Sequence, residues 1–127
     1  MKTSEAPAPK ESDIQRAYFQ WVRLMALTDW RYKLIKGDCN GAHFAKGFKT
    51  AAFQKSMGML PGWPDVTVPV SGKGRGILFI EFKAGKGRVS DEQSKVLTML
   101  ANAGNAVHVI RSAGLAMQIT QAWMEGL

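Results

Sequence analysis

The chain has a single cysteine, Cys39, and no long apolar run. One cysteine excludes an internal disulfide and fits a reducing compartment. Because no stretch of about 18 apolar residues occurs, no segment is expected to span a membrane. Residues 1–10 lack the apolar centre of a signal peptide, so we expect a flexible tail in front of one domain over residues 11–127. Together these absences favour an intracellular, cytoplasmic location.

Acidic residues are also scarce. Ten Asp and Glu residues stand against seventeen Lys and Arg, which gives a net charge of +7 and an isoelectric point near 9.8. One interpretation is a generic basic protein that its charge keeps soluble. The other is a polyanionic partner, for which nucleic acid is the first candidate.

The 127 residues are enough for one hydrophobic core. Apolar periodicity and turn residues predict helices over 12–28, 44–57, 90–103 and 112–124, and strands over 31–36, 65–70, 76–83 and 106–110. Ser12 followed by Gln15 predicts a capping box at the first helix. Because the strand 76–83 is apolar on both faces, layers must cover both sides of it. We therefore expect an α/β fold, a mixed central sheet flanked by helices in the order αβαββαβα.

Two acidic residues and a lysine stand at strand ends. Asp65 opens one predicted strand, Glu81 and Lys83 close the next, and the glycine-rich stretch 71–76 between the strands predicts a hairpin. The hairpin brings Asp65 close to Glu81, and strand alternation puts Lys83 on the same face as Glu81. Burying these charges is unfavourable unless a charged ligand binds them.

Each of these short strings alone also fits a turn or a solvated ion pair. In combination they predict a metal-dependent phosphodiesterase site, with Asp65 and Glu81 as hard oxygen ligands for Mg²⁺ or Mn²⁺. The backbone carbonyl of Phe82 is a candidate further ligand, and Lys83 is placed to orient water or offset charge on the phosphate. Cys39, His43 and His108 are too few and too poorly spaced for zinc, and we expect His108 in the core.

An ordered set of motifs resembles a known family. The set comprises Gly62-Trp63-Pro64-Asp65, Glu81-Phe82-Lys83, and Gly87-Arg88-Val89-Ser90 with Gln93, and it also includes Glu11 to Gln15, Asn40-Gly41 and Thr50-Ala51-Ala52. It resembles the PD-(D/E)xK nuclease superfamily, and within it the small stand-alone VRR-NUC domains of phages and bacteria. The resemblance covers residues 11 to 125 and implies a restriction-endonuclease-like fold.

The resemblance further implies a Mg²⁺- or Mn²⁺-dependent endodeoxyribonuclease, similar to Holliday-junction resolvases, that leaves 5′-phosphate ends in a bacterial cell or in the host cell of a phage. By position, Asp65 and Glu81 correspond to metal ligands, Lys83 to the catalytic lysine and Gln93 to a motif glutamine near the active site. Glu11 corresponds to an acidic residue of the first helix that approaches the metal in related nucleases.

Two of these residues also have structural interpretations. Gln93 follows Ser90 by three positions and fits a capping-box partner. Its spacing to Val96 and Leu97 also directs it toward the sheet, where it would join the site. If Ser12 caps the first helix, Glu11 lies outside it and acts as a favourable charge near the helix end.

Basic residues surround the predicted site. Candidate DNA-binding residues are Lys46, Lys49, Arg75, Lys86 and Arg88, each of which also fits a solvated side chain. Such contacts hold phosphates without reading sequence, so we expect a preference for DNA structure, four-way junctions first. Four Trp and seven Met favour a homodimer, which suits paired incisions. The alternatives are a nuclease acting on flaps, ends or nicks, and a non-catalytic basic nucleic-acid-binding module.

Overall fold

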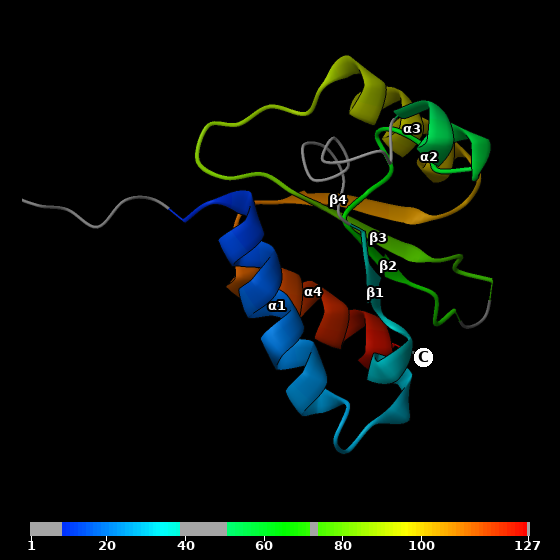
Figure 1. Cartoon of the computed structure of the whole chain (residues 1–127). Helices are drawn as coiled ribbons and strands as arrows, with labels where there is room; N and C mark the ends of the chain where they lie inside the picture. The colour runs from blue at the N-terminus through cyan, green and yellow to red at the C-terminus, as the bar shows by residue number, and fades with distance from the viewer. Residues whose placement is uncertain (1–8, 39–50, 72–73, 127) are drawn as a thin grey trace, which may run out of the picture.

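In a computed structural model of the protein, which describes residues 9–38, 51–71 and 74–126, four strands form one mixed sheet (Figure 1). Their order across the sheet is β1 (Lys36–Gly37), β2 (Val66–Val68), β3 (Leu78–Phe82) and β4 (Ala106–Ile110). β2 is antiparallel to β1 and β3, whereas β3 and β4 are parallel. The predicted hairpin and the order αβαββαβα are confirmed.

Helices cover both faces of this sheet. α1 (Glu11–Met25) and α4 (Ala113–Glu125) lie on one face, and α2 (Ala51–Ser56) and α3 (Asp91–Asn102) lie on the other (Figure 1). Leu78, Ile80 and Phe82 of β3 belong to the core that contains the buried stripes of α1 and α4. Tyr18 and Thr120 join these two helices through a buried hydroxyl–hydroxyl hydrogen bond of 2.8 Å. The α/β sandwich is therefore built on β3, the strand that carries Glu81.

The first helix begins at residue 11, one residue earlier than the sequence predicts. Lys10, not Ser12, is the N-cap, and the Lys10 backbone N–H donates to Asp13 Oδ2 at 3.1 Å. The prediction of a Ser12–Gln15 capping box is therefore wrong. Gln15 instead donates its side-chain amide to the Asp38 carbonyl at 3.3 Å, which ties α1 to the end of β1. As a result, Glu11 is the first residue of the helix.

The predicted strand over 31–36 is wrong for most of its length, because residues Trp30–Leu34 form a 3-10 helix. Asp29 is its N-cap and accepts from the backbone N–H of Arg31 at 3.1 Å, while the Arg31 guanidinium bonds the same carboxylate at 2.7 Å. These local bonds fold the chain into a turn before β1 begins. The strand is reduced to Lys36–Gly37.

Two further expectations differ from the structure. His108 is exposed even though strand alternation puts it on the same face of β4 as the buried Ile110, because β4 is an edge strand; its expected place in the core is therefore wrong. Of the predicted helix 44–57, residues 51–56 form α2, and residues 44–50 lie outside the described part of the chain. No helix in the described ranges is long and apolar enough to cross a bilayer.

Candidate active site

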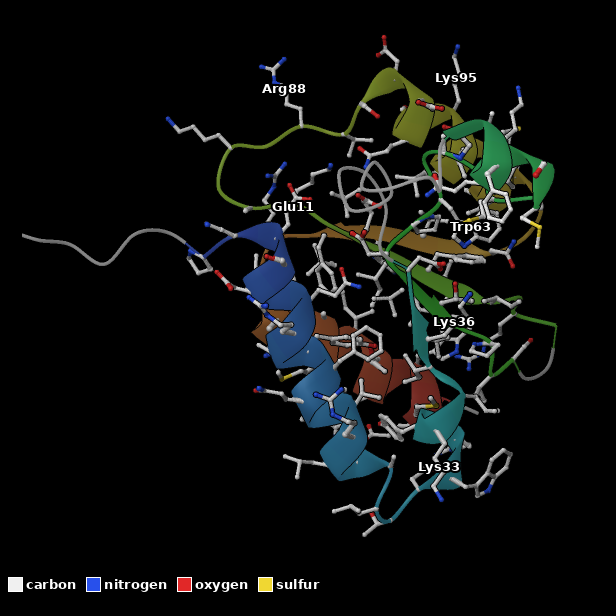
Figure 2. All side chains as sticks on the ribbon, viewed as in Figure 1. Glu11, Lys33, Lys36, Trp63, Arg88 and Lys95 are labelled. Atoms are coloured by element: carbon white, nitrogen blue, oxygen red, sulfur yellow. The ribbon has the colours of Figure 1, made fainter. Side chains whose placement is uncertain are left out.

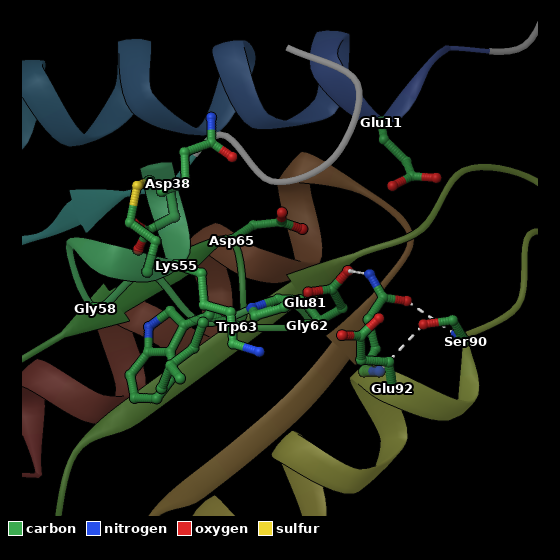
Figure 3. Close-up of a pocket in the computed structure, with 15 residues that line it drawn as sticks. Glu11, Asp38, Lys55, Gly58, Gly62, Trp63, Asp65, Glu81, Ser90 and Glu92 are labelled. Carbon is green, nitrogen blue, oxygen red and sulfur yellow. Dashed lines mark hydrogen bonds between the residues drawn. The ribbon is translucent and has the colours of Figure 1, made fainter. Parts of the chain in front are cut away.

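Asp65 and Glu81 meet where the β2–β3 hairpin begins and ends. Val66 pairs with Ile80, so the same antiparallel register sets Asp65 opposite Glu81. Asp65 Oδ2 accepts from the Phe82 backbone N–H at 2.7 Å, which fixes its carboxylate against β3. Antiparallel partners project to the same face of a sheet, so both carboxylates point into one cleft (Figure 3).

Glu81 is almost fully enclosed, with 1% of its surface exposed. Its Oε2 accepts from the Gln93 side-chain amide at 2.9 Å, whereas its buried Oε1 has no hydrogen-bond partner among the described residues. A buried carboxylate oxygen without a partner is costly, typically by about 1–3 kcal/mol. A cation or a hydrogen-bond donor bound to this oxygen would therefore stabilise the protein.

The protonation equilibria of the two acids reflect their burial and proximity. Burial, and then the neighbouring charge of Asp65, raise the pKa of Glu81 from its ordinary 4.5 to about 8. Burial also raises the pKa of Asp65 from 3.8 to about 6, although the Phe82 N–H opposes the rise. A divalent cation would reverse both effects by pairing with the ionised forms, so the oxygen donors present here fit Mg²⁺ or Mn²⁺.

Lys83 and Glu11 complete the charged group. Lys83 Nζ lies 3.5 Å from Glu81 Oε2 and 3.9 Å from Glu11 Oε1, and the lysine side chain is 9% exposed. Glu11 reaches this group because α1 begins at residue 11, which rules out the interpretation that places it outside the helix. The structure thus brings Glu11 from α1 to the strand acids (Figures 2 and 3).

Gln93 occupies both positions that its spacing predicts. Its backbone N–H donates to Ser90 Oγ at 3.1 Å and its side-chain oxygen accepts from the Ser90 N–H at 2.9 Å, which is the capping box of α3. The other end of the same amide donates to Glu81. The cap therefore sets the amide orientation and thereby holds the Glu81 carboxylate in place.

The two strand acids do not enclose a cation by themselves. Among the residues that the structure describes, no three Asp, Glu, His or Cys side chains converge closely enough to hold a metal. Oxygens from the backbone, water or a phosphate would have to complete the coordination shell of Asp65 and Glu81. Phe82, whose carbonyl is the predicted further ligand, ends β3 between Glu81 and Lys83.

A cleft of about 900 Å³ surrounds these acids. Its walls include Met59, Leu60, Pro61 and Trp63 from the segment between α2 and β2, which sequence reasoning did not assign to the site. Trp63 directly precedes the Pro64-Asp65 motif, and this position in the sequence was the one indication that it belongs to the site.

Asp38 is a further residue of the cleft that the sequence did not identify. Its backbone N–H donates to the Asp65 carbonyl at 2.8 Å, which continues the β1–β2 register and sets Asp38 beside Asp65 at the cleft. Its Oδ1 lies 3.6 Å from Lys36 Nζ, and its buried Oδ2 has no hydrogen-bond partner in the described ranges. The sequence does not reveal how β1 pairs with β2, and this pairing is what places Asp38 beside Asp65.

The basic residues divide into three groups. Lys86 and Arg88 are exposed on the loop that joins β3 to α3, and the guanidinium of Arg111 donates to the Gly85 carbonyl of this loop at 2.9 Å (Figures 1 and 2). Arg75 lies elsewhere: its guanidinium stacks 4.0 Å from the Trp123 ring centroid and donates to the Trp123 carbonyl. Lys46 and Lys49 lie outside the described residues.

The two-sided α/β sandwich with a carboxylate pair and a lysine at one end of its central hairpin defines a restriction-endonuclease-like fold. A solved structure described as a VRR_NUC domain protein is similar, with a TM-score of 0.74 and 19% identity over 94% of this chain and 91% of that chain. The family model of the VRR-NUC domain matches residues 7–114. The chain belongs to the VRR-NUC family and is a nuclease-type domain whose substrate is nucleic acid. No curated protein sequence matches it significantly.

Proposed function

We propose that the protein is a metal-dependent, structure-selective DNA endonuclease that acts on branched DNA, with four-way junctions as the first candidate substrate. The observation that carries this proposal is the Asp65–Glu81 pair next to Lys83, in which Glu81 is buried and its Oε1 has no hydrogen-bond partner among the described residues. A structural ion pair needs no such oxygen, whereas a cation site does.

Asp65 and Glu81 would hold Mg²⁺ or Mn²⁺, with the Phe82 carbonyl as a third oxygen and Glu11 as an outer one. When bound, such a cation lowers the pKa of water and offsets negative charge on a phosphate. Lys83 Nζ, held between Glu81 and Glu11, would donate hydrogen bonds to the attacking water or to the phosphate oxygen that gains charge. The water oxygen would attack phosphorus and lose a proton while the bond between phosphorus and the 3′ oxygen breaks; the 3′ oxygen would take up a proton and leave as a 3′-hydroxyl, and a 5′-phosphate would remain.

The basic loop between β3 and α3 would bind the DNA backbone. Lys86 and Arg88 follow Lys83 along the chain and are both exposed, and Figure 2 shows Arg88 on the loop beyond β3. Contacts of this kind position a duplex without reading its bases, which supports a preference for shape. Arg75 is not included, because its guanidinium is engaged with Trp123 on α4.

A homodimer would provide two such sites for paired incisions. Four exposed apolar side chains in the last turn of α1, in the turn that follows it and in the 3-10 helix support it; we call them the α1-end cluster. They are Leu24, Leu27, Trp30 and Leu34, with exposed fractions of 65%, 80%, 67% and 48%. Grouped apolar side chains at the surface are typical of protein contacts.

The proposal is tested by incubating the protein with a four-way junction, a flap, a duplex and single-stranded DNA, each with Mg²⁺, Mn²⁺ or EDTA. Cleavage with a metal and none in EDTA is expected, and Asp65→Ala, Glu81→Ala and Lys83→Ala should each abolish it while DNA binding persists. Lys33→Ala, which removes an exposed lysine far from the cleft, is the control (Figure 2).

The pattern of products distinguishes the alternatives. Cleavage of flaps, ends or nicks but not of junctions would assign the protein to that class of nuclease. Tight binding by folded protein without cleavage in any metal would make it a non-catalytic nucleic-acid-binding module. Near-normal turnover by the Lys83→Ala variant would show that the active site lies elsewhere.

A further inference from the structure

Trp63 lies in the same cleft as the carboxylate pair (Figure 3). It is half-buried and stands two residues before Asp65, so the two α carbons are at most about 7 Å apart. Met59, Leu60 and Pro61 line the cleft beside it, whereas Asp65 and Glu81 line its acidic part. The cleft therefore has an apolar, aromatic wall directly next to the proposed phosphodiester site.

The Trp63 ring is held rigidly. Its backbone N–H donates to the Leu60 carbonyl at 3.4 Å and closes a turn with Pro61 second and Gly62 third, and the φ of +80° at Gly62 matches a type II turn. Behind the ring, Phe79 makes an edge-to-face contact with a centroid distance of 5.5 Å and an interplanar angle of 88°.

Gly62 also locks this turn against α3. A Cβ added at Gly62 would lie 2.9 Å from the Glu92 carbonyl oxygen, so the turn touches the helix backbone itself. A side chain fixed in this way loses little conformational entropy when a flat ligand stacks on it.

We infer that Trp63 is a stacking platform for an unpaired nucleobase adjacent to the scissile phosphate. The inference rests on the proposed function, because the phosphate would sit at the acidic part of the cleft and its base on the apolar wall. Bases inside a duplex are stacked and cannot reach a side chain in a cleft without being extruded. DNA with an unstacked nucleotide at the cut site, as at flaps, frayed ends and branch points, is therefore the favoured substrate class.

Stacking on an aromatic ring contributes to binding without regard to base identity. The platform would thus add selectivity for DNA structure while leaving sequence unread. It would also give a small domain a way to distinguish branched from continuous duplex DNA through one cleft residue.

The inference is tested with a DNA flap whose unpaired nucleotide is 2-aminopurine and with a matched duplex, with Ca²⁺ in place of Mg²⁺ so that binding is read without cleavage. Wild-type protein is expected to quench the flap fluorophore and to bind the flap more tightly than the duplex. Trp63→Leu should lose the quenching and bind the flap roughly tenfold more weakly, with duplex binding unchanged. Trp63→Phe, which keeps an aromatic ring, should retain most of both effects.

Leu115→Ala is the control, because Leu115 is 45% exposed on α4 and belongs neither to the cleft nor to the α1-end cluster. Circular dichroism and the melting temperature verify that each variant is folded. If Trp63→Leu is not folded, Trp63→Met, which also lacks an aromatic ring, takes its place. Equal quenching and an equal flap-to-duplex ratio in wild type and Trp63→Leu would overturn the inference even if the protein cleaves DNA. Quenching that depends on Trp63 without metal-dependent cleavage would support the platform and refute the nuclease proposal.

Discussion

Replacing Glu81 with glutamine should stabilise the metal-free protein at neutral pH. Glutamine keeps the size of the side chain and an oxygen that can accept from Gln93, but it cannot ionise. The wild-type carboxyl has a pKa raised by burial and by Asp65 to about 8, so in the folded state it must retain a proton that the unfolded chain has released. Glu81→Gln removes this requirement.

The sign and size of the effect follow from the two pKa values. Because the folded-state pKa of Glu81 is raised, the wild type is most stable below the unfolded value of 4.5 and loses stability as the pH rises toward about 8. At about 1.4 kcal/mol per pKa unit, the loss between about pH 6 and about pH 8 is roughly 2 kcal/mol. The pKa of Asp65 is about 6, so this pH window reports mainly on Glu81.

The free energy of unfolding is measured by urea denaturation with circular dichroism, in EDTA, at several pH values from about 6 to about 8. The wild type should lose roughly 2 kcal/mol across this range and Glu81→Gln less than about 0.5 kcal/mol. Glu125→Gln, which removes an exposed carboxylate on α4, should keep the wild-type slope. At about pH 8, Mn²⁺ should raise the free energy of unfolding of the wild type but not that of Glu81→Gln. Parallel pH profiles for wild type and Glu81→Gln would refute the assignment of a raised pKa to Glu81.

Three further predictions address the turn, the loop and the dimer. In urea denaturation, Gly62→Ala should destabilise the protein by about 1–3 kcal/mol more than Gly58→Ala. Both glycines have a positive φ, but a Cβ at Gly58 would have open space whereas one at Gly62 would meet the backbone of α3. Equal losses of stability would refute the contact between Gly62 and α3. Arg88→Ala should weaken DNA binding in fluorescence anisotropy and lower the slope of log affinity against log salt by about one, and an unchanged slope would remove Arg88 from the interface. Leu27→Asp should convert a dimer to monomers in sedimentation velocity whereas Met57→Asp, an exposed residue after α2, should not; a monomeric wild type would refute the dimer.

The centre of the site could be predicted from the sequence because local signals agree there. Apolar strands on either side of a glycine-rich turn set the hairpin, and strand periodicity then fixes Asp65 opposite Glu81. Gln93 was ambiguous between a cap and a site residue, and the structure shows one amide with both contacts. A capping box that also binds the strand acid cannot be recognised from spacing alone.

The parts that could not be predicted depend on contacts between distant segments or on competing local bonds. The 3-10 helix replaces a strand because Asp29 bonds the backbone and the guanidinium of Arg31, which hydrophobic alternation does not report. Asp38 reaches the cleft through a strand of two residues, too short for a periodic signal. Whether Arg75 faces the DNA or another part of the protein depended on its contact with Trp123, 48 residues away.

The segment from Leu60 to Asp65 connects the proposed chemistry with the proposed selectivity. Pro61 and Gly62 set the turn, Trp63 forms the wall, and Asp65 supplies a carboxylate, so one short stretch of backbone fixes the distance between the base platform and the acid. Contact of Gly62 with the first turn of α3 then ties this stretch to Gln93, which holds Glu81. A displacement of the turn would therefore shift Trp63 and Asp65 together and disturb the helix turn that carries Gln93, so the proposed platform and the proposed catalytic residues share one support.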